Sequence, residues 1–541
     1  MPKLPPRADL DTHDVTNQPG KAPPHDLWAR DPALQTYAKA NGADTSNLAQ
    51  TGAIYADDVL HTAAADARRD PPRLVTYDAA GRRLDEVHFN TGYHQVMQVA
   101  TKAGYANSAW IADSGGHATH AAHVYLLSQL EPGCCCPLTM TYAAQPVLAK
   151  DPPMAQLWAP KLQSAQYDPR VMPVNEKLGA TLGMAMTEKQ AGSDLRRTSS
   201  RAEPDDELYR IFGHKWFCSA PMSDGFLTLA QAPGGLTCFL VPRWLDGERN
   251  GIHLQRLKNK LGNHANATAE IEFDDALAGK IGEEGEGIKT IMDMVQHSRL
   301  DASIAPAGLM RAALSEVSHW AQSRRAFGHA LIDQPLMQSV LADLALDAEG
   351  ALALSMSMAA AFDRADDTST SLARVGVALA KYLNNKRCVH VVSEAMEIIG
   401  GLGYIEDTPL PMLYREAPLN GIWEGAGNVI CLDVLRTLRK DRTAQAAIDA
   451  QLDGMKGRDR YFDAALGIHR KRWLTVPDEA EARWFTESLA TLMTGASLLE
   501  NAPNEIAEAY IGSRLSEHRG TTAGALGSFN TQAILARLTG T

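Results

Sequence analysis

The sequence predicts an α+β protein that is mostly α-helical, with a small antiparallel β-domain between two helical domains and a further helical domain at the C-terminus. Apolar residues recur at helical spacing before residue 180 and again from about 284 to 440. Between 181 and 275 the apolar segments are short and are separated by Gly, Pro, Asp or Asn, which is typical of strands joined by turns. Strands and helices do not alternate along the chain, which argues against a sheet built from βαβ units.

A chain of 541 residues is too long for one compact core, so we expect four parts. Residues 1–180 are predicted to form an N-terminal arm, ending near residue 70, and a helical domain that contains YHQVMQVATKAGYANSAW and THAAHVYLLSQL. Residues 181–283 are the β-domain, with strands in TLGMAM, ELYRIFG, FLTLAQA, LTCFLVP and TAEIEF. Residues 284–440 form the second helical domain. Residues 441–541 form a helical extension, marked by DRYFDAALGIHRKRW, EARWFTESLATLMTGASLL, NEIAEAYIGSRL and NTQAILARL.

Composition excludes several classes of protein. The formal net charge of -12 argues against nucleic acid as a partner of the whole surface, so any such site must be local. The N-terminus has no apolar signal segment, and no apolar stretch reaches the roughly 18 residues that span a bilayer, so we expect a cytoplasmic protein without a membrane partner. The consecutive Cys134, Cys135 and Cys136 fit reduced thiols, and small buried residues explain them as well as a redox role does. The spacing of His117, His120 and His123 drifts around a helix, so no metal site is expected.

Three segments could carry chemistry. AMTEKQAGSD, residues 185–194, leaves a predicted strand and offers hydroxyls and unobstructed N–H groups, which suits a flavin or a pyrophosphate as well as an ordinary polar turn. EIIGGLGYIED, residues 397–407, follows a helix pattern and is explained by a helix end. In NGIWEGAGNVICLDVLR, Glu424 stands beside Trp423 and a glycine turn that opens a helix. Glu424 is therefore either a general base with a raised pKa or a helix N-terminal acid.

In order, these motifs resemble the acyl-CoA dehydrogenase family over roughly residues 80–440. Two further segments support the resemblance, namely KLGNHANATAEIEFDDALAGKIGEEGEGIKTIMDM and SRRAFGHALIDQPLMQSVLADL. The match is closest to the alkylation-response branch of the family, through MTEKQAGSD, GHKWF, IWEGAGN, KGRDRYFD and the helices after residue 440. The resemblance implies a homotetrameric FAD flavoprotein, a dimer of dimers, that binds double-stranded DNA through the C-terminal extension and protects it from alkylating agents. It also implies weak or vestigial acyl-CoA dehydrogenase activity, with an acyl-CoA or an alkylating small molecule as a further ligand.

The resemblance assigns roles residue by residue. Glu424 matches the base that removes the α-proton of an acyl thioester while the flavin accepts the β-hydride. The residues that match FAD contacts are Met186, Thr187, Gly192, Ser193, Phe217, Cys218, Ser219, Trp423, Gly425, Ala426 and Asn428. Arg324 matches an arginine that reaches the FAD phosphates from a neighbouring subunit. The sequence departs from the family pattern at Arg197, Gln296, Glu397 and Met412. These differences weaken the prediction that the protein uses an acyl-CoA more than the prediction that it binds FAD.

The C-terminal extension is not basic overall, because residues 441–541 hold 11 Lys and Arg against 13 Asp and Glu. DNA binding therefore requires cations to cluster in the folded domain. The candidates are Arg436, Arg439, Lys440, Arg470, Lys471, Arg472, Arg483, Arg514 and Arg519. Two alternatives stay open: a working acyl-CoA dehydrogenase whose extension only shapes the oligomer, or a protein whose FAD is structural. The substrate and any preferred DNA sequence are not readable from the sequence.

Overall fold

The computed structural model describes residues 4–364 and 366–540 of the chain. The chain begins with an extended arm and then folds into helices α1 (Pro32–Ala40), α2 (Thr45–Ile54) and α3 (Asp58–Arg69). Aspartates at positions 31, 44 and 57 accept hydrogen bonds from the first turns of these helices, because the leading N–H groups of a helix have no partner within it. Local sequence thus fixes where each of these helices begins.

The rest of the N-terminal part combines one hairpin with further helices. Strands β1 (Arg73–Tyr77) and β2 (Arg83–His88) pair antiparallel, a hairpin that helical periodicity did not predict. The helices that follow are α4 (Thr91–Ala103), α5 (Ser108–Ile111), α6 (Gly116–Leu130), α7 (Pro132–Leu148) and α8 (Pro152–Leu162). Helices α6 and α7 are buried along almost their whole length, including the three histidines of α6.

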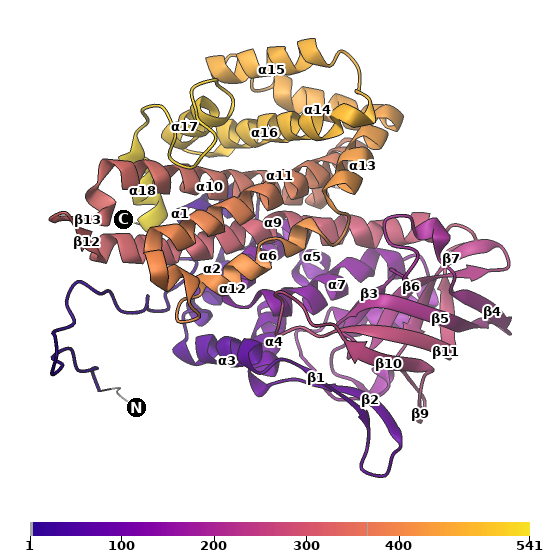
Figure 1. The fold of residues 1–541 in the computed structure, drawn as a ribbon. Coiled ribbons are helices and arrows are strands. Elements are labelled where there is room, and N and C mark those ends of the chain that lie inside the picture. Colours follow the sequence, from indigo (N-terminus) through magenta and orange to yellow (C-terminus); the bar gives the residue numbers. More distant parts are fainter. Residues whose placement is uncertain (1–3, 365, 541) are drawn as a thin grey trace.

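The β-domain lies to one side of the helices (Figure 1). Its strands are β3 (Leu182–Ala185), β4 (Arg201–Asp205), β5 (Leu208–Ser219), β6 (Gly225–Ala232), β7 (Gly235–Pro242), β8 (Trp244–Leu245), β9 (Glu248–Arg249), β10 (Ile252–Leu257) and β11 (Thr268–Ile281). Strand β7 pairs with both β6 and β11, so β11, β5, β4, β6 and β7 form a closed ring of pairings around a core of their own. The expected antiparallel pattern holds except that β6 pairs parallel with β3 and β4.

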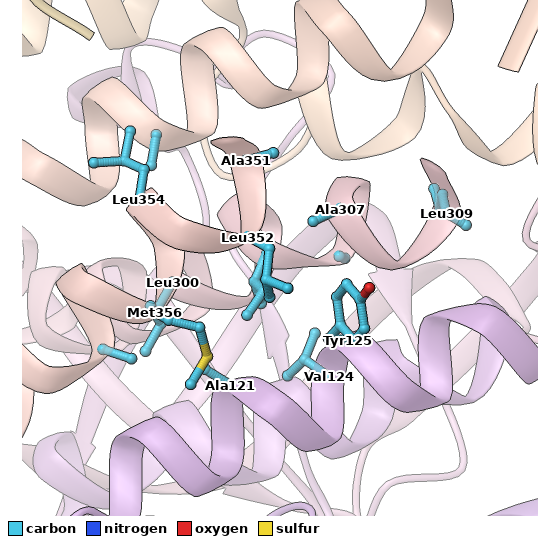
Figure 2. Close-up of a cluster of buried hydrophobic side chains, with 14 of the residues drawn as sticks. Ala121, Val124, Tyr125, Leu300, Ala307, Leu309, Ala351, Leu352, Leu354 and Met356 are labelled. Carbon is cyan, nitrogen blue, oxygen red and sulfur yellow. The ribbon is translucent and has the colours of Figure 1, made fainter. Parts of the chain in front are cut away.

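Three long helices form the centre of the molecule: α9 (Gly287–Ser323), α10 (Pro335–Asp363) and α11 (Asp367–Ile399). A small hairpin, β12 (Arg325–Ala326) and β13 (His329–Ala330), joins the first two. Figure 2 shows side chains of α6, α9 and α10 packed together, including Tyr125, Leu300 and Met356. By length and composition α10 could cross a membrane, contrary to the expectation from the sequence, but 94% of its most apolar window is buried inside the fold.

The remaining helices are α12 (Leu410–Glu416), α13 (Gly427–Lys440), α14 (Arg442–Asp453), α15 (Arg460–Arg472), α16 (Ala482–Asn501), α17 (Asn504–Arg514) and α18 (Thr531–Thr539). Helices α14–α17 lie over α10 and α11, on the side away from α3 and α4 (Figure 1). Their buried residues, such as Phe462, Leu489 and Tyr510, belong to the same hydrophobic cluster as the central helices. The C-terminal extension therefore shares its core with the second helical domain.

Candidate active site and cationic surface

Glu424 lies on a sharp turn between the short helical turn Leu419–Gly421 and α13. Its backbone φ is 57° and that of Gly425 is 102°, so two successive residues adopt the left-handed region that L-residues avoid. A Cβ at Gly425 would lie 3.2 Å from Ile430 Cδ1 and 3.5 Å from an Arg299 nitrogen. The positive φ is the main reason for a glycine after Glu424, and a Cβ there would also require the Ile430 side chain to shift slightly.

Two helices hold this turn. Ser298 Oγ on α9 donates to the Glu424 carboxylate at 2.9 Å, and Arg299 Nε donates to the Glu424 carbonyl at 3.1 Å. Lys381 Nζ on α11 donates to the Gly425 carbonyl at 2.8 Å. The carboxylate and both carbonyls of the turn therefore have donors from elements distant in sequence.

The surroundings of Glu424 favour its action as a general base. Burial raises the pKa of the Glu424 carboxyl, while the Ser298 hydrogen bond and the charges of Lys381 and Arg299 act in the opposite direction without cancelling the rise. A carboxylate with a raised pKa is a better proton acceptor near neutral pH than an exposed one. The general-base interpretation thus has a physical basis, and Glu424 is not an ordinary acid at a helix N-terminus because it precedes the first residue of α13 by three positions.

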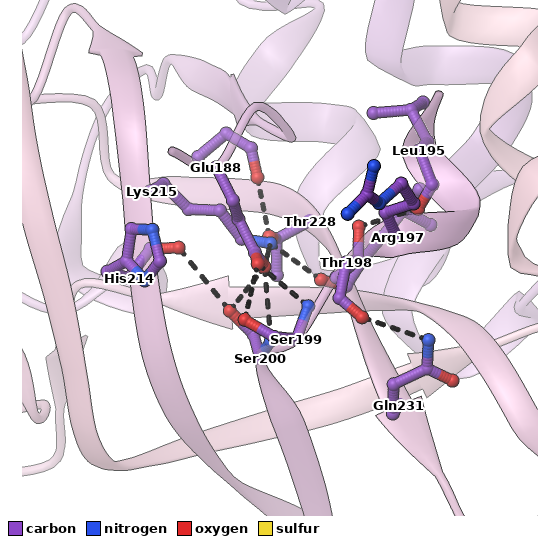
Figure 3. A network of polar contacts seen from close by, with 12 residues as sticks. Glu188, Leu195, Arg197, Thr198, Ser199, Ser200, His214, Lys215, Thr228 and Gln231 are labelled. Atoms are coloured by element: carbon purple, nitrogen blue, oxygen red, sulfur yellow. Dashed lines mark hydrogen bonds and ion pairs between the residues drawn. The ribbon is translucent and has the colours of Figure 1, made fainter. Parts of the chain in front are cut away.

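The loop after β3 is anchored by one buried carboxylate. Glu188 accepts from Lys215 Nζ at 2.8 Å and from the backbone N–H groups of Ser199 and Ser200 (Figure 3). Burial would raise the pKa of Glu188, but Lys215 and these donors lower it to about 2. Both ends of the loop are therefore fixed, and Gly192 and Ser193 are exposed between them.

Strand β5 presents the other predicted contacts beside this loop, since the Trp216 N–H donates to the Thr187 carbonyl at 2.7 Å. Phe217 is 49% exposed, and Ser219 Oγ lies 3.2 Å from Thr268 Oγ1. Cys218 points the other way and is fully buried in the β-domain core. The Cys218 side chain therefore faces the β-domain core, because alternate residues of a strand face opposite sides. Of Cys218, only the backbone is left for the predicted contact of this segment with a flavin, which stays a prediction.

The remaining predicted FAD contacts surround Glu424 and the strand end. Met186, Thr187 and Trp423 are half-buried, and Trp423 Nε1 donates to Asn420 Oδ1 at 2.8 Å. Ala426 and Asn428 are exposed at the start of α13. Gly425 leaves the space beside Glu424 free of a Cβ, and Phe217 and Gly192 are exposed at the β-domain. The residues present thus suit an isoalloxazine ring and a diphosphate.

Arg324 stands apart from these residues. It follows the last residue of α9, 26 residues beyond Ser298, so roughly 39 Å of helix separates the two. Its guanidinium donates to the Asn17 carbonyl at 2.5 Å and to Gln18 Oε1 at 3.2 Å in the N-terminal arm. Within one copy of the chain Arg324 therefore lies far from the Glu424 turn, as expected for a residue predicted to reach FAD from a neighbouring subunit, and that role stays a prediction.

The predicted DNA-binding residues divide into two groups. Arg436, Arg439, Lys440, Lys471, Arg472 and Arg483 are exposed on α13, α15 and α16, and we refer to these six as the C-terminal cationic surface. Arg470 is half-buried and lies 2.6 Å from Asp453 and 2.9 Å from Asp449.

Arg514 is not available to DNA, and Arg519 is only partly exposed. The side chain of Arg514 is 1% exposed and lies 2.5 Å from Asp343 and 2.9 Å from Asp347, on α10. The side chain of Arg519 is 17% exposed and lies 3.6 Å from Asp343. The prediction of Arg514 as a DNA contact is wrong, because periodicity and charge do not show which face of α17 a neighbour covers. The prediction for Arg519, which follows α17, stays a prediction.

Sequence reasoning missed Ser298 and Lys381. A signal for Lys381 was present, because it is a single cation within the apolar run VGVALAKYL. Buried lysines are rare unless they are paired or functional. Ser298 had no comparable signal, since serine in a long helix is unremarkable until the helix is placed beside Glu424.

The histidines and cysteines that were discounted are buried. His120 contacts Asp301 at 2.7 Å and the Tyr105 carbonyl at 2.6 Å, and His117 contacts the Tyr142 hydroxyl at 2.8 Å. Cys134, Cys135 and Cys136 are at most 8% exposed at the start of α7. Among the described residues no group of His, Cys, Asp and Glu is arranged to hold a metal ion.

The fold and the Glu424 turn define a class of flavoprotein. The acyl-CoA dehydrogenase middle domain matches residues 183–276 and the acyl-CoA dehydrogenase C-terminal domain matches residues 285–439. The chain belongs to the acyl-CoA dehydrogenase family. Within this family it groups with the AidB-like members, because the adaptive response protein AidB N-terminal domain matches residues 17–169.

Individual proteins agree with this assignment. The acyl-CoA dehydrogenase homologue AidB of Escherichia coli is 43% identical over 507 residues, which cover 92% of this chain and 94% of that protein. The structure of Caenorhabditis elegans ACDH-11 in complex with C11-CoA aligns with a TM-score of 0.84 at 27% identity, over 94% of this chain and 95% of that one. An acyl-CoA dehydrogenase from Bacillus anthracis, complexed with FAD, has a TM-score of 0.65 at 18% identity over 83% and 86% of the two chains, which shows the shared fold.

Proposed function

We propose that this protein is an FAD flavoprotein of the adaptive response to DNA alkylation, which binds double-stranded DNA and protects it from alkylating agents while retaining weak acyl-CoA dehydrogenase activity. One observation carries the proposal: six exposed cations lie on the helices that begin at the Glu424 turn and continue into the C-terminal extension. Phosphate contacts from such a cluster supply most of the non-specific affinity for a duplex. The match to the adaptive response protein supports the biological context.

Two contacts connect the three helices that carry the C-terminal cationic surface. Arg439 Nη2 at the end of α13 donates to the Pro477 carbonyl, in the loop after α15, at 2.5 Å. The Arg472 guanidinium lies over the exposed ring of Trp484 on α16, 3.5 Å from its centroid. Arg472 also pairs with Glu481 at 2.7 Å, and both side chains are partly exposed. Exchanging such an exposed pair for a phosphate costs little, because exposed ion pairs contribute only about 0–1 kcal/mol.

Fluorescence anisotropy of a labelled duplex tests this proposal. The full-length protein is titrated across a salt series and compared with a variant that carries Arg439→Glu, Lys440→Glu and Lys471→Glu. We expect affinity that falls steeply with salt, and a weaker salt dependence in the triple variant, because each lost phosphate contact reduces the slope by about 0.9. The matched control is Lys102→Glu, an exposed lysine in the last turn of α4. No binding by the intact flavoprotein at low salt would reject the DNA role.

Charge reversal is preferable to deletion of residues 441–541. The deletion would remove Arg514 from Asp343 and Asp347 and would uncover the faces of α10 and α11 on which α16 packs. Loss of DNA binding in a truncated chain would then report unfolding as readily as a missing binding surface.

The proposed cofactor site uses residues of this chain and of a second copy. Met186, Thr187, Gly192, Ser193, Phe217, Ser219, Trp423, Gly425, Ala426 and Asn428 would hold FAD, which supplies a hydride acceptor when it is bound. Arg324 of a neighbouring copy would meet the diphosphate, so we propose a tetramer, a dimer of dimers, in the cytoplasm. Sedimentation of the wild type and of Arg324→Ala checks this assembly: the variant should lose FAD on dilution while it keeps its helical content.

A working acyl-CoA dehydrogenase is the second candidate, and the geometry of Glu424 favours it. Ser298 holds one carboxylate oxygen of Glu424, which leaves the other to accept the α-proton of an acyl thioester. The C. elegans relative was solved with C11-CoA, which supports this ligand class.

Anaerobic titration with short straight-chain and branched acyl-CoAs separates the two candidates. Rapid flavin bleaching that is lost in Glu424→Gln supports the enzyme. Slow bleaching together with salt-sensitive DNA binding supports the first proposal. An FAD that no acyl-CoA bleaches would show a structural cofactor.

A further inference from the structure

Lys381 is a buried lysine without the partner that such lysines usually have. Its residue is 2% exposed on α11, yet no ion pair within 4 Å is formed by it among the described residues. Lys215 and Lys177, which are equally buried, contact the carboxylates of Glu188 and Asp224 at 2.8 and 2.5 Å. Removing an ammonium from water is costly unless a charge or a hydrogen bond compensates it. The hydrogen-bond partner of Lys381 should therefore explain why a lysine occupies this position.

Lys381 contacts the turn that contains Glu424. Its Nζ donates to the Gly425 carbonyl at 2.8 Å, while Arg299 Nε donates to the preceding carbonyl, that of Glu424, at 3.1 Å. Two cations from different helices thus hold two successive carbonyls. Glu424 and Gly425 both have positive φ, and Glu424, which carries a side chain, is the residue for which this left-handed conformation is unfavourable.

We propose that Lys381 is a positioning residue for Glu424: its ammonium fixes the Gly425 carbonyl, and with it the strained turn, and its positive charge keeps the Glu424 carboxylate ionised. This inference rests on the proposed base role of Glu424 for its consequence in catalysis. Arg299 lies 2.7 Å from the Asp433 carboxylate, which it shares with Arg374 and Arg436, whereas Lys381 has no carboxylate within 4 Å among the described residues.

The charged and polar groups around Glu424 and Lys381 determine the protonation of both side chains. Glu424 faces Ser298, Arg299 and Asp301 from α9, Lys381 from α11 and Cys136 from α7. Lys381 faces Glu424, Arg299 and Lys386. Burial lowers the pKa of Lys381 to about 7, and Arg299 and Lys386 act in the same direction, while Glu424 acts against them. The charge of Lys381 lowers the pKa of Glu424, so its removal should raise that pKa further.

Infrared difference spectra over a pH titration measure the protonation of Glu424 directly. The carbonyl band of the protonated acid is assigned as the band that is absent in Glu424→Gln. We compare the wild type with Lys381→Met, which removes donor and charge, and with Lys381→Gln, which keeps a donor for the Gly425 carbonyl but no charge. Lys381→Arg tests rescue by the conservative change, and Lys102→Met, at an exposed lysine on α4 away from the Glu424 turn, is the control.

In both neutral variants we expect Glu424 to titrate at least about one pH unit higher, a tenfold increase in its proton affinity. Glu424 should titrate close to its wild-type pH in Lys381→Arg and in Lys102→Met. An unchanged Glu424 titration in folded Lys381→Gln would overturn the proposal and leave Lys381 a structural residue. If Lys381→Met does not fold, Lys381→Gln still decides the question.

The kinetic readout separates this inference from the proposed function. If acyl-CoA bleaches the flavin, the acidic limb of the plot of kcat against pH should shift to higher pH in Lys381→Gln. This shift should equal the shift in the infrared titration of Glu424, and KM should change little. If no acyl-CoA bleaches the wild-type flavin, the proposed enzymatic function fails. The infrared titration continues to report on the contact between Lys381 and the Glu424 turn.

Discussion

The Arg514 guanidinium on α17 lies 2.5 Å from the Asp343 carboxylate on α10, and both side chains are at most 2% exposed. Asp347, one turn further along α10, lies 2.9 Å from the same guanidinium. Burial would lower the pKa of Arg514, but the two carboxylates outweigh it and raise it. This buried cluster attaches the C-terminal extension to the central helices, and it explains why Arg514 cannot serve DNA.

Arg514→Met should destabilise the protein strongly. It leaves Asp343 and Asp347 buried without their main partner, and breaking a buried ion pair on one side typically costs about 3–5 kcal/mol. Urea unfolding followed by circular dichroism measures the change. Arg460→Met, an exposed arginine at the start of α15, is the control and should change stability by less than about 0.5 kcal/mol. Equal stability of Arg514→Met and the wild type would show that the ion pair is not important for docking the extension.

The Glu188–Lys215 pair should be coupled to cofactor retention. Both side chains are fully buried, and Glu188 ties together the two ends of the loop that presents Gly192 and Ser193. Lys215→Met leaves the buried Glu188 carboxylate without its cation, so we expect loss of bound FAD and a lower free energy of unfolding. The double variant Glu188→Gln, Lys215→Met should recover part of the stability. Flavin absorbance after gel filtration and a double-mutant cycle measure both effects, and additive effects would mean that the two residues act separately.

Gly425→Ala should lose FAD and stability, because its φ of 102° strains an L-residue and its Cβ would lie 3.2 Å from Ile430 Cδ1. We expect about 1–3 kcal/mol, the usual cost of an unfavourable backbone conformation. Gly467→Ala is a control of opposite sign. Gly467 lies within α15 with no atom within 4 Å of a new Cβ, so alanine should stabilise that helix by up to about 1 kcal/mol. Thermal unfolding and flavin content compare the two, and a harmless Gly425→Ala would contradict the geometry of the turn.

Acid should destabilise the protein through its buried histidines. Burial lowers the pKa of His469 to about 4 and that of His123 to about 3. The unfolded chain therefore binds these protons first, near pH 6.5, and stability falls as the pH drops below that value until the folded groups also titrate. At pH 5.5 each such histidine should cost about 1.4 kcal/mol relative to neutral pH. His469→Gln, which can keep a hydrogen bond to Ser488, should flatten this part of the stability profile in urea unfolding. An unchanged slope would show that His469 is not responsible.

The sequence predicted much of the fold through local patterns. Helical periodicity located α10 and the helices α15–α18 to within a few residues, and Gly, Pro, Asp and Asn marked the turns of the β-domain. It did not predict the β1–β2 hairpin or the parallel pairing of β3 with β6, because the residue pattern of one strand does not specify which strand pairs with it. It also placed Cys218 at the cofactor, although its side chain faces the core.

By itself the sequence determined that Glu424 and its glycines form a sharp turn before a helix, because residue type and backbone conformation are coupled locally. Motif order also identified the family. Only the tertiary structure decided which side chains serve that turn: Ser298 is 126 residues from Glu424 and Lys381 is 44 residues from Gly425. It likewise separated the exposed cations of α13, α15 and α16 from the buried Arg514. The physical reason is that burial and the contacts between distant residues depend on how helices pack on one another, and local sequence does not specify which neighbour covers which face.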